Sequence, residues 1–152
     1  MPLMSRVDPV WSAPSTSGVE AVKVPVVGVV HPGARAAAAV TRSRRVGVIG
    51  TEATVASGAY EKAVKTLSPR ASVVSQACPL FVPLVEEGWW NGVVVEETAK
   101  KYLKPLRLAR VDTVILGCTH YPYLKPVLQK AFGKSVRLVD SADETAKETE
   151  RI

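Results

Sequence analysis

Short apolar runs recur along the chain, and polar or periodic segments separate them. Residues 46–50 (Val-Gly-Val-Ile-Gly) and 113–117 (Thr-Val-Ile-Leu-Gly) are the clearest, and further runs span residues 24–30, 71–76 and 136–140. A continuous β-branched run of roughly four to eight residues is typical of a strand that is buried on both faces. We therefore predict five strands at these positions.

The segments between the runs carry helical patterns. Residues 34–41 are rich in alanine, and Pro105 is expected to kink or shorten the helix that contains it. Strand and helix alternate along the chain, which predicts an α/β domain of three layers (α/β/α) around a mainly parallel sheet. The apolar stripes at helical spacing are Ala56, Ala59, Tyr60 and Ala63; Val95, Ala99, Tyr102 and Leu106; and Leu124, Val127, Leu128 and Ala131.

The chain of 152 residues is long enough for one domain with a sizeable core. Residues 1–20 are rich in Pro, Ser and Gly and show little periodicity, so we expect a disordered or unrelated leader there. No apolar run approaches the roughly 18–20 residues of a membrane span. The first residues, Met-Pro-Leu-Met-Ser-Arg, lack the apolar core of a secretion signal. These features predict a cytoplasmic protein without a membrane partner.

Charge and cysteine content add two observations. The net charge is +6, and Arg42, Arg44 and Arg45 cluster before a predicted strand. They form either an anion or nucleic-acid patch or a solvated helix end. The absence of interleaved aromatic residues favours the helix end, so we expect no nucleic-acid partner. The two cysteines, Cys78 and Cys118, lack a CxxC or Cys/His pattern, which predicts free thiols and no metal site.

Ligands of open α/β sheets bind beyond the carboxyl ends of the strands, and two segments with reactive side chains are expected there. The first is residues 50–54 (Gly-Thr-Glu-Ala-Thr), which follow a strand and open a helix. The hydroxyls of Thr51 and Thr54, with free helix N–H groups, could hold a carboxylate or phosphate. Alternatively, one of these threonines simply caps the helix.

The second segment places Cys118 directly after the strand at residues 113–117, with His120 two residues on. An imidazole or a helix N-terminus can raise the thiolate fraction of a nearby cysteine. Three interpretations remain open from the residues alone: a Cys/His nucleophile, a cysteine that transfers protons, and a structural cysteine.

Residues 117–122 (Gly-Cys-Thr-His-Tyr-Pro) are similar to the second cysteine motif of the glutamate racemase family. A Cys-Thr-His sequence alone would suggest only the wider aspartate/glutamate racemase superfamily. The added Tyr-Pro, and Cys-Pro-Leu-Phe-Val-Pro-Leu-Val-Glu at residues 78–86, favour glutamate racemase. The resemblance covers roughly residues 24–152, and its other segments occur in the family's order at residues 48–55, 77–88, 112–116 and 139–146.

The resemblance implies a racemase that uses neither cofactor nor metal. In that family two cysteines face opposite sides of the glutamate Cα, because inversion needs proton removal on one face and delivery on the other. By resemblance, Cys118 is one of these acid–base groups, and Thr119 and His120 contact the substrate. Glu86 then orients or polarises His120, whereas its neighbour Glu87 is expected to be solvated.

The resemblance also assigns the remaining candidates. Thr51 and Thr54 are expected to line the same pocket. Cys78 lies outside the catalytic motif and is expected to be structural, as is His31. The product, D-glutamate, would serve peptidoglycan synthesis and hence cell shape.

The chain also departs from the family. Asp-Ser-Gly, Pro-Tyr-Gly and Cys-Asn-Thr, which mark the family's first half, do not occur. We therefore expect residues 21–31 to hold the last strand of a truncated first domain and residues 32–140 to form the second domain of a pseudo-symmetric pair. Residues 141–152 would start the helix that returns to the first domain. Such a chain is expected to be inactive alone, and either to form a homodimer or to pair with the missing N-terminal half.

Two other functions stay open. The chain could be a non-catalytic module that binds a dicarboxylate or a protein partner. It could also be an isomerase or hydrolase of the same superfamily that uses Cys118 and His120 on another substrate, and a hydrolase would form an acyl-thiol intermediate.

Overall fold

The computed structural model describes residues 25–152, so the predicted leader at residues 1–20 lies outside the described residues. A single parallel sheet with the strand order β2-β1-β3-β4 forms the centre of the domain. Its strands are β1 (Arg45–Gly50), β2 (Ser72–Ala77), β3 (Thr113–Leu116) and β4 (Arg137–Asp140).

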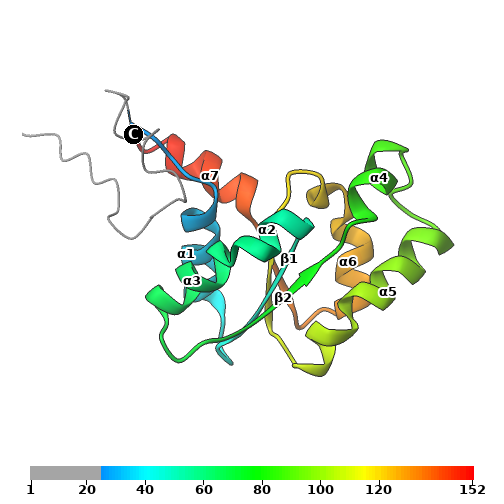
Figure 1. Cartoon of the computed structure of the whole chain (residues 1–152), viewed down its shortest axis with the longest axis horizontal. Coiled ribbons are helices and arrows are strands. Elements are labelled where there is room, and N and C mark those ends of the chain that lie inside the picture. Colours follow the sequence, from blue (N-terminus) through cyan, green and yellow to red (C-terminus); the bar gives the residue numbers. More distant parts are fainter. Residues whose placement is uncertain (1–24) are drawn as a thin grey trace, which may run out of the picture.

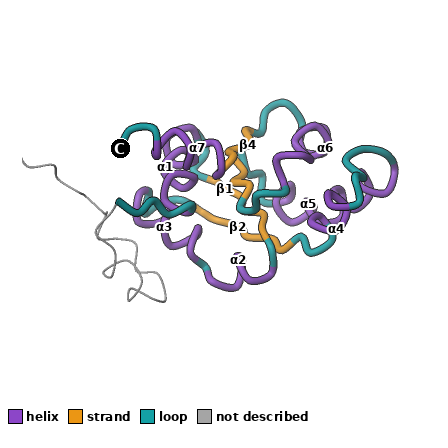
Figure 2. Tube along the Cα trace, turned by 90° about the horizontal axis from the view of Figure 1, so that it is seen from above, coloured by secondary structure: helices purple, strands orange, loops and turns teal. Residues whose placement is uncertain are grey.

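Helices cover both faces of this sheet, as the sequence predicts (Figure 1). Seen from above, α1, α3 and α7 lie on one side of the strands and α4, α5 and α6 on the other (Figure 2). The domain is therefore the predicted three-layer α/β/α arrangement. The helices are α1 (Val30–Val40), α2 (Glu52–Ser57), α3 (Ala59–Leu67), α4 (Phe81–Glu86), α5 (Val93–Leu108), α6 (Lys125–Phe132) and α7 (Ser141–Thr149), with a 3-10 helix, η2 (Tyr121–Leu124).

Two hydrophobic clusters fill the space between the layers, because successive side chains of a strand point to opposite faces. Val46, Val48 and Ile115 pack with residues of α1 and α3. Val114 and Leu116 pack with residues of α4, α5 and α6. All five side chains are almost fully buried, which explains the continuous apolar runs in the sequence.

The prediction of a strand at residues 24–30 is wrong for the described part of this segment. Residues 25–29 form no strand, and α1 begins at Val30. His31 and Pro32, which we expected to follow a strand, lie in the first turn of this helix. Proline is tolerated there because the first N–H groups of a helix have no intrahelical partner. A β-branched run forms a strand only beside a neighbouring strand, and the outer strands here are β2 and β4. Residues 21–24 lie outside the described residues.

Three smaller predictions also need correction. The helix α5 continues past Pro105 to Leu108, so the proline does not shorten it, whereas a kink at this position stays a prediction. The predicted stripe from Ala56 to Ala63 belongs to two helices, α2 and α3. The arginine cluster consists of exposed residues after α1, with Arg42 and Arg44 in the turn and Arg45 as the first residue of β1, and the last turn of α1 holds no basic residue. None of the helices within residues 25–152 has the length and hydropathy that crossing a membrane requires.

The turn between α1 and β1 is fixed by Asp112, just before β3. Its carboxylate accepts hydrogen bonds from the hydroxyls of Thr41 and Thr113 and from the backbone N–H groups of Arg42 and Ser43. Burial raises the pKa of Asp112, but the bonds from Thr41, Ser43 and Arg42 outweigh it and hold the pKa well below its usual range. The charged carboxylate therefore stabilises the junction of three elements.

We expect Asp112→Asn to lower the free energy of unfolding at pH 7 by about 2–3 kcal/mol, because an amide nitrogen then faces N–H or hydroxyl donors. A carboxyl with a lowered folded pKa stabilises the fold above its unfolded value and loses that contribution as the pH falls through its folded value. The difference between the two proteins should therefore shrink below about pH 4. Urea unfolding between pH 3 and pH 7 tests this. Glu150→Gln, at an exposed position, is the control; an equal loss there would contradict the assignment.

Candidate active site

Cys118 and Thr51 follow neighbouring strands at the same edge of the sheet. The strands β1 and β3 are parallel and adjacent, with Ile49 opposite Leu116. The N–H of Gly117 donates to the Ile49 carbonyl at 2.8 Å, which extends this pairing beyond β3. The structure thus brings both residues to the carboxyl edge, as the sequence predicts.

The residue before the thiol, Gly117, sits in a position without room for a side chain. A Cβ atom there would lie 3.0 Å from the Ile49 carbonyl oxygen and 3.0 Å from the ring of Tyr60. The Tyr60 hydroxyl in turn donates to Ser141 Oγ at 2.9 Å, and both residues are buried. The backbone that presents Cys118 is therefore held between β1 and the helix α3. The sequence shows Tyr60 only as part of an apolar stripe, which predicts burial but not this hydrogen bond.

The thiol lies beside an imidazole that contacts a carboxylate. Cys118 Sγ is 3.9 Å from His120 Nδ1, and His120 Nε2 is 3.3 Å from Glu86 Oε1. When Nε2 carries the proton and donates to Glu86, Nδ1 is free to accept from the thiol. The three side chains that the resemblance singled out therefore form one chain of contacts, although Glu86 comes from α4 and the other two follow β3. Their catalytic roles stay predictions.

The two candidate threonines contact each other. Thr51 is the N-cap of α2: its hydroxyl accepts from the Thr54 N–H at 3.3 Å and lies 3.0 Å from the Thr54 hydroxyl. The capping alternative is thus confirmed for Thr51, whereas a contact of either residue with a substrate stays a prediction. Thr119, beside the thiol, is exposed.

Cys78 has a different environment. Its side chain is fully buried, in the cluster between the sheet and α5, and its thiol donates to the Gln76 carbonyl at 3.6 Å. Burial raises the pKa of Cys78 to about 12. This thiol is a packing group, in agreement with its interpretation as structural.

The two thiols should differ in reactivity. We expect iodoacetamide to alkylate Cys118 in the folded protein, because its thiol is partly exposed, and to reach Cys78 only after unfolding. Mass spectrometry of peptides from samples taken over time, with and without denaturant, measures both rates. Faster labelling of Cys78 in the folded protein would contradict the assignment of the two cysteines.

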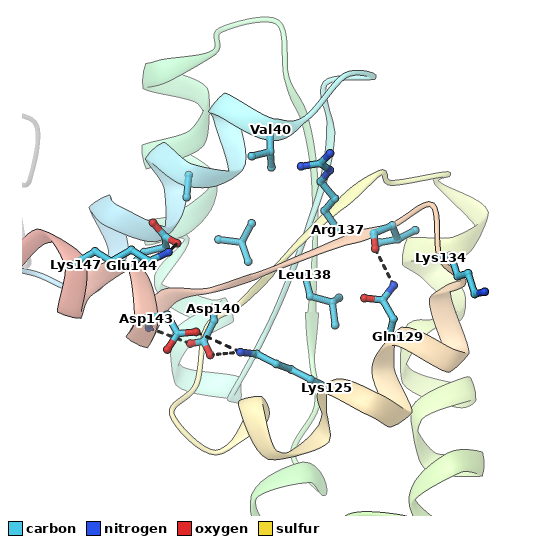
Figure 3. A pocket seen from close by; sticks show the side chains of 13 residues that line it. Val40, Lys125, Gln129, Lys134, Arg137, Leu138, Asp140, Asp143, Glu144 and Lys147 are labelled. Carbon is cyan, nitrogen blue, oxygen red and sulfur yellow. Dashed lines mark hydrogen bonds and ion pairs between the residues drawn. The ribbon is translucent and has the colours of Figure 1, made fainter.

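A groove along β4, with a volume of about 500 Å³, is a second place where a ligand could lie. Two of its carboxylates are already paired with a lysine (Figure 3): Lys125 Nζ lies 2.7 Å from Asp140 and 3.4 Å from Asp143. Gln129 donates to the Val136 carbonyl at 2.9 Å. The groove is lined by neither a thiol nor an imidazole, so Cys118 marks the better candidate for catalysis. Among residues 25–152, no three His, Cys, Asp or Glu side chains are grouped as metal ligands.

Comparison with known proteins identifies the family of the chain. Residues 19–149 match the family described as Asp/Glu/Hydantoin racemase. The chain belongs to this family. The resemblance that the sequence motifs indicated is therefore confirmed.

Within this racemase family, the matched relatives are about twice as long as the chain. A glutamate racemase from Geobacter metallireducens is 60% identical over 128 residues, which are 84% of this chain and 47% of the relative. One from Bacillus cereus is 50% identical over 129 residues, 85% of this chain and 48% of the relative. The chain thus spans about half the length of the curated relatives that it matches.

Solved structures of racemases share the fold. Glutamate racemase RacE1 from Bacillus anthracis superposes with a TM-score of 0.84 at 44% identity, covering 89% of this chain and 51% of that one. The enzyme from Francisella tularensis, solved in complex with D-glutamate, gives 0.82 at 34% identity, covering 91% of this chain and 51% of that one.

Proposed function

We propose that this chain supplies one of the two acid–base thiols of a cofactor-independent glutamate racemase, and that this thiol is Cys118. The observation that carries the proposal is the placement of Cys118 at the carboxyl end of β3, beside a His120–Glu86 pair. The names of the relatives, and D-glutamate in the Francisella structure, support glutamate as the substrate. The product would supply peptidoglycan synthesis in the cytoplasm.

The proposed reaction moves one proton across the substrate. One group removes the Cα proton as a thiolate, and a thiol on the opposite face delivers another, so that the configuration inverts. On this chain the Cys118 sulfur takes or gives the proton, and His120 Nδ1 can accept the thiol proton when the thiolate forms. The hydroxyls of Thr51, Thr54 and Thr119 are candidates for holding the substrate carboxylates.

The second acid–base group must come from another part of the assembled enzyme. Cys78 is fully buried, and its thiol donates to the Gln76 carbonyl. It can therefore neither contact a substrate nor exchange a proton with it. We propose that the other group belongs to the half of the family's fold that this chain does not match.

One observation favours a second function. A thiol beside an imidazole that contacts a carboxylate is also the arrangement of a nucleophilic cysteine. A hydrolase of this superfamily would form a covalent acyl-thiol on Cys118, whereas proton transfer leaves the sulfur unmodified. Intact-mass measurement during turnover separates the two.

Racemase activity is tested by joining residues 24–152 behind the part of the Geobacter metallireducens relative that this chain does not match. We expect the joined protein to convert L-glutamate into the racemic mixture, as measured by chiral chromatography. The intact relative is the control. A joined protein that unfolds cooperatively but forms no D-glutamate would contradict the proposal. A non-catalytic module predicts that outcome.

A further inference from the structure

A tryptophan next to the candidate active site connects the two elements that carry Glu86 and His120. The indole Nε1 of Trp90 donates to the Val85 carbonyl at 2.9 Å, one residue before Glu86. Its ring lies against Tyr123 in η2, with ring centroids 5.1 Å apart and planes inclined by 36°. Tyr123 itself donates its N–H to the His120 carbonyl at 3.2 Å. These contacts therefore link α4 to the segment that carries His120, in addition to the direct contact between Glu86 and His120.

The turn after α4 directs Trp90 back onto the end of that helix. The last carbonyls of a helix have no intrahelical partner. Here Gly88, with φ of +75°, donates to Val85 at 3.0 Å, and Trp89 donates its N–H to Leu84 at 2.8 Å. This is the hydrogen-bond pattern that commonly ends a helix with a left-handed glycine. The indole then adds a second donor to the Val85 carbonyl, so the position of Trp90 follows from the local chain.

The Glu86–His120 pair needs such support because it is exposed. The side chains of Glu86 and His120 are 63% and 35% exposed, and a polar contact that is open to water restrains its partners only weakly. The two residues also come from segments that are far apart in the sequence. An aromatic contact that joins both segments restricts their relative movement.

We propose that Trp90 is a positioning residue for the Glu86–His120 pair and, through that pair, sets the reactivity of the Cys118 thiol. The inference rests on the proposed function in so far as Cys118 is the reacting thiol. Trp90 itself touches neither the thiol nor a reacting atom. Trp89, the preceding residue, is 52% exposed and Trp90 is 45% exposed, so Trp89 serves as a matched control position.

The test is a double-mutant cycle on the rate at which iodoacetamide alkylates Cys118 at neutral pH. Glu86→Gln should slow the reaction roughly three- to tenfold, because an amide can also donate to Nε2 of His120 and so no longer fixes the tautomer whose Nδ1 accepts from the thiol. Trp90→Ala should slow it by a similar factor. The double variant should be no slower than Glu86→Gln alone, because Trp90 acts through the same pair. Trp90→Phe, which keeps a ring against Tyr123, should recover part of the rate, and Trp89→Ala should leave it unchanged.

Four outcomes would overturn the inference: no effect of Glu86→Gln, no effect of Trp90→Ala, effects of these two substitutions that multiply in the double variant, or equal slowing by Trp89→Ala. If Trp90→Ala does not fold, as judged by its melting temperature, Tyr123→Ser removes the same ring contact and enters the cycle in its place. Alkylation needs no turnover. If the two substitutions are coupled in the alkylation rate but the joined protein does not racemise glutamate, only the proposed function is contradicted. If the joined protein racemises glutamate but the two substitutions are not coupled, only this inference is contradicted.

Discussion

Replacing Cys118 by serine in the joined protein is expected to lower D-glutamate formation by a factor of about 10²–10⁴, the usual contribution of a general acid–base group. A serine hydroxyl is a far weaker acid than a thiol. It therefore provides neither the base that removes the Cα proton at neutral pH nor a donor matched to the carbanionic transition state. The loss should appear in kcat, since the substrate contacts that we propose for Thr51, Thr54 and Thr119 do not involve the replaced thiol.

Hydrogen exchange identifies the step that Cys118→Ser removes. In deuterated water, the acid–base group on the opposite face can still exchange the Cα hydrogen of one enantiomer, whereas inversion requires both groups. NMR spectroscopy of each enantiomer should therefore show exchange of only one. Cys78→Ser, measured below its melting temperature, is the control and should keep its turnover because that thiol is sealed in the core. Inversion at the unchanged rate in the Cys118→Ser protein would show that another residue is the acid–base group.

The sequence predicts the central strands of the domain because a strand that is buried on both faces appears in the sequence as a continuous apolar run. The strands β1 and β3 appear as continuous apolar runs, and both are buried along nearly their whole length. Residues 24–30 show the same pattern but form no strand in their described part. The difference lies in the neighbours available for backbone pairing, which a local pattern does not report.

The candidate site could be predicted only in part. The alignment of Cys118 with Thr51 follows from parallel strands that end at one edge of the sheet. The hydrophobic periodicity of the sequence does not distinguish Glu86 from Glu87 as the partner of His120. Only the family resemblance selected Glu86. The structure then shows Glu86 next to His120. The ring contact of Trp90 with Tyr123 and the hydrogen bonds of Asp112 join segments that are distant in the sequence, and neither residue type indicates its partner.

A polypeptide of these 152 residues, purified alone, is expected to form D-glutamate at least about 10²–10⁴ times more slowly than the joined protein, because one acid–base group is lacking. Only Cys118 is available as a thiol at the candidate site, since Cys78 is fully buried. The site is also open to water: Thr119 is exposed and the Glu86 side chain is 63% exposed. A carbanionic transition state in contact with water gains less from fixed dipoles than one in a closed site.

Chiral chromatography after a long incubation measures this slow rate, and Cys118 alkylation on the same sample shows that the half-site is correctly built. The concentration dependence of any turnover carries the decisive information. If two copies paired weakly so that each supplied one Cys118 to a shared substrate, the rate would rise with the square of the protein concentration as long as most of the protein is monomeric. A rate within about tenfold of the joined protein, from a sample that is monomeric by analytical ultracentrifugation, would place both acid–base groups within one chain and contradict the assignment of Cys78 as structural.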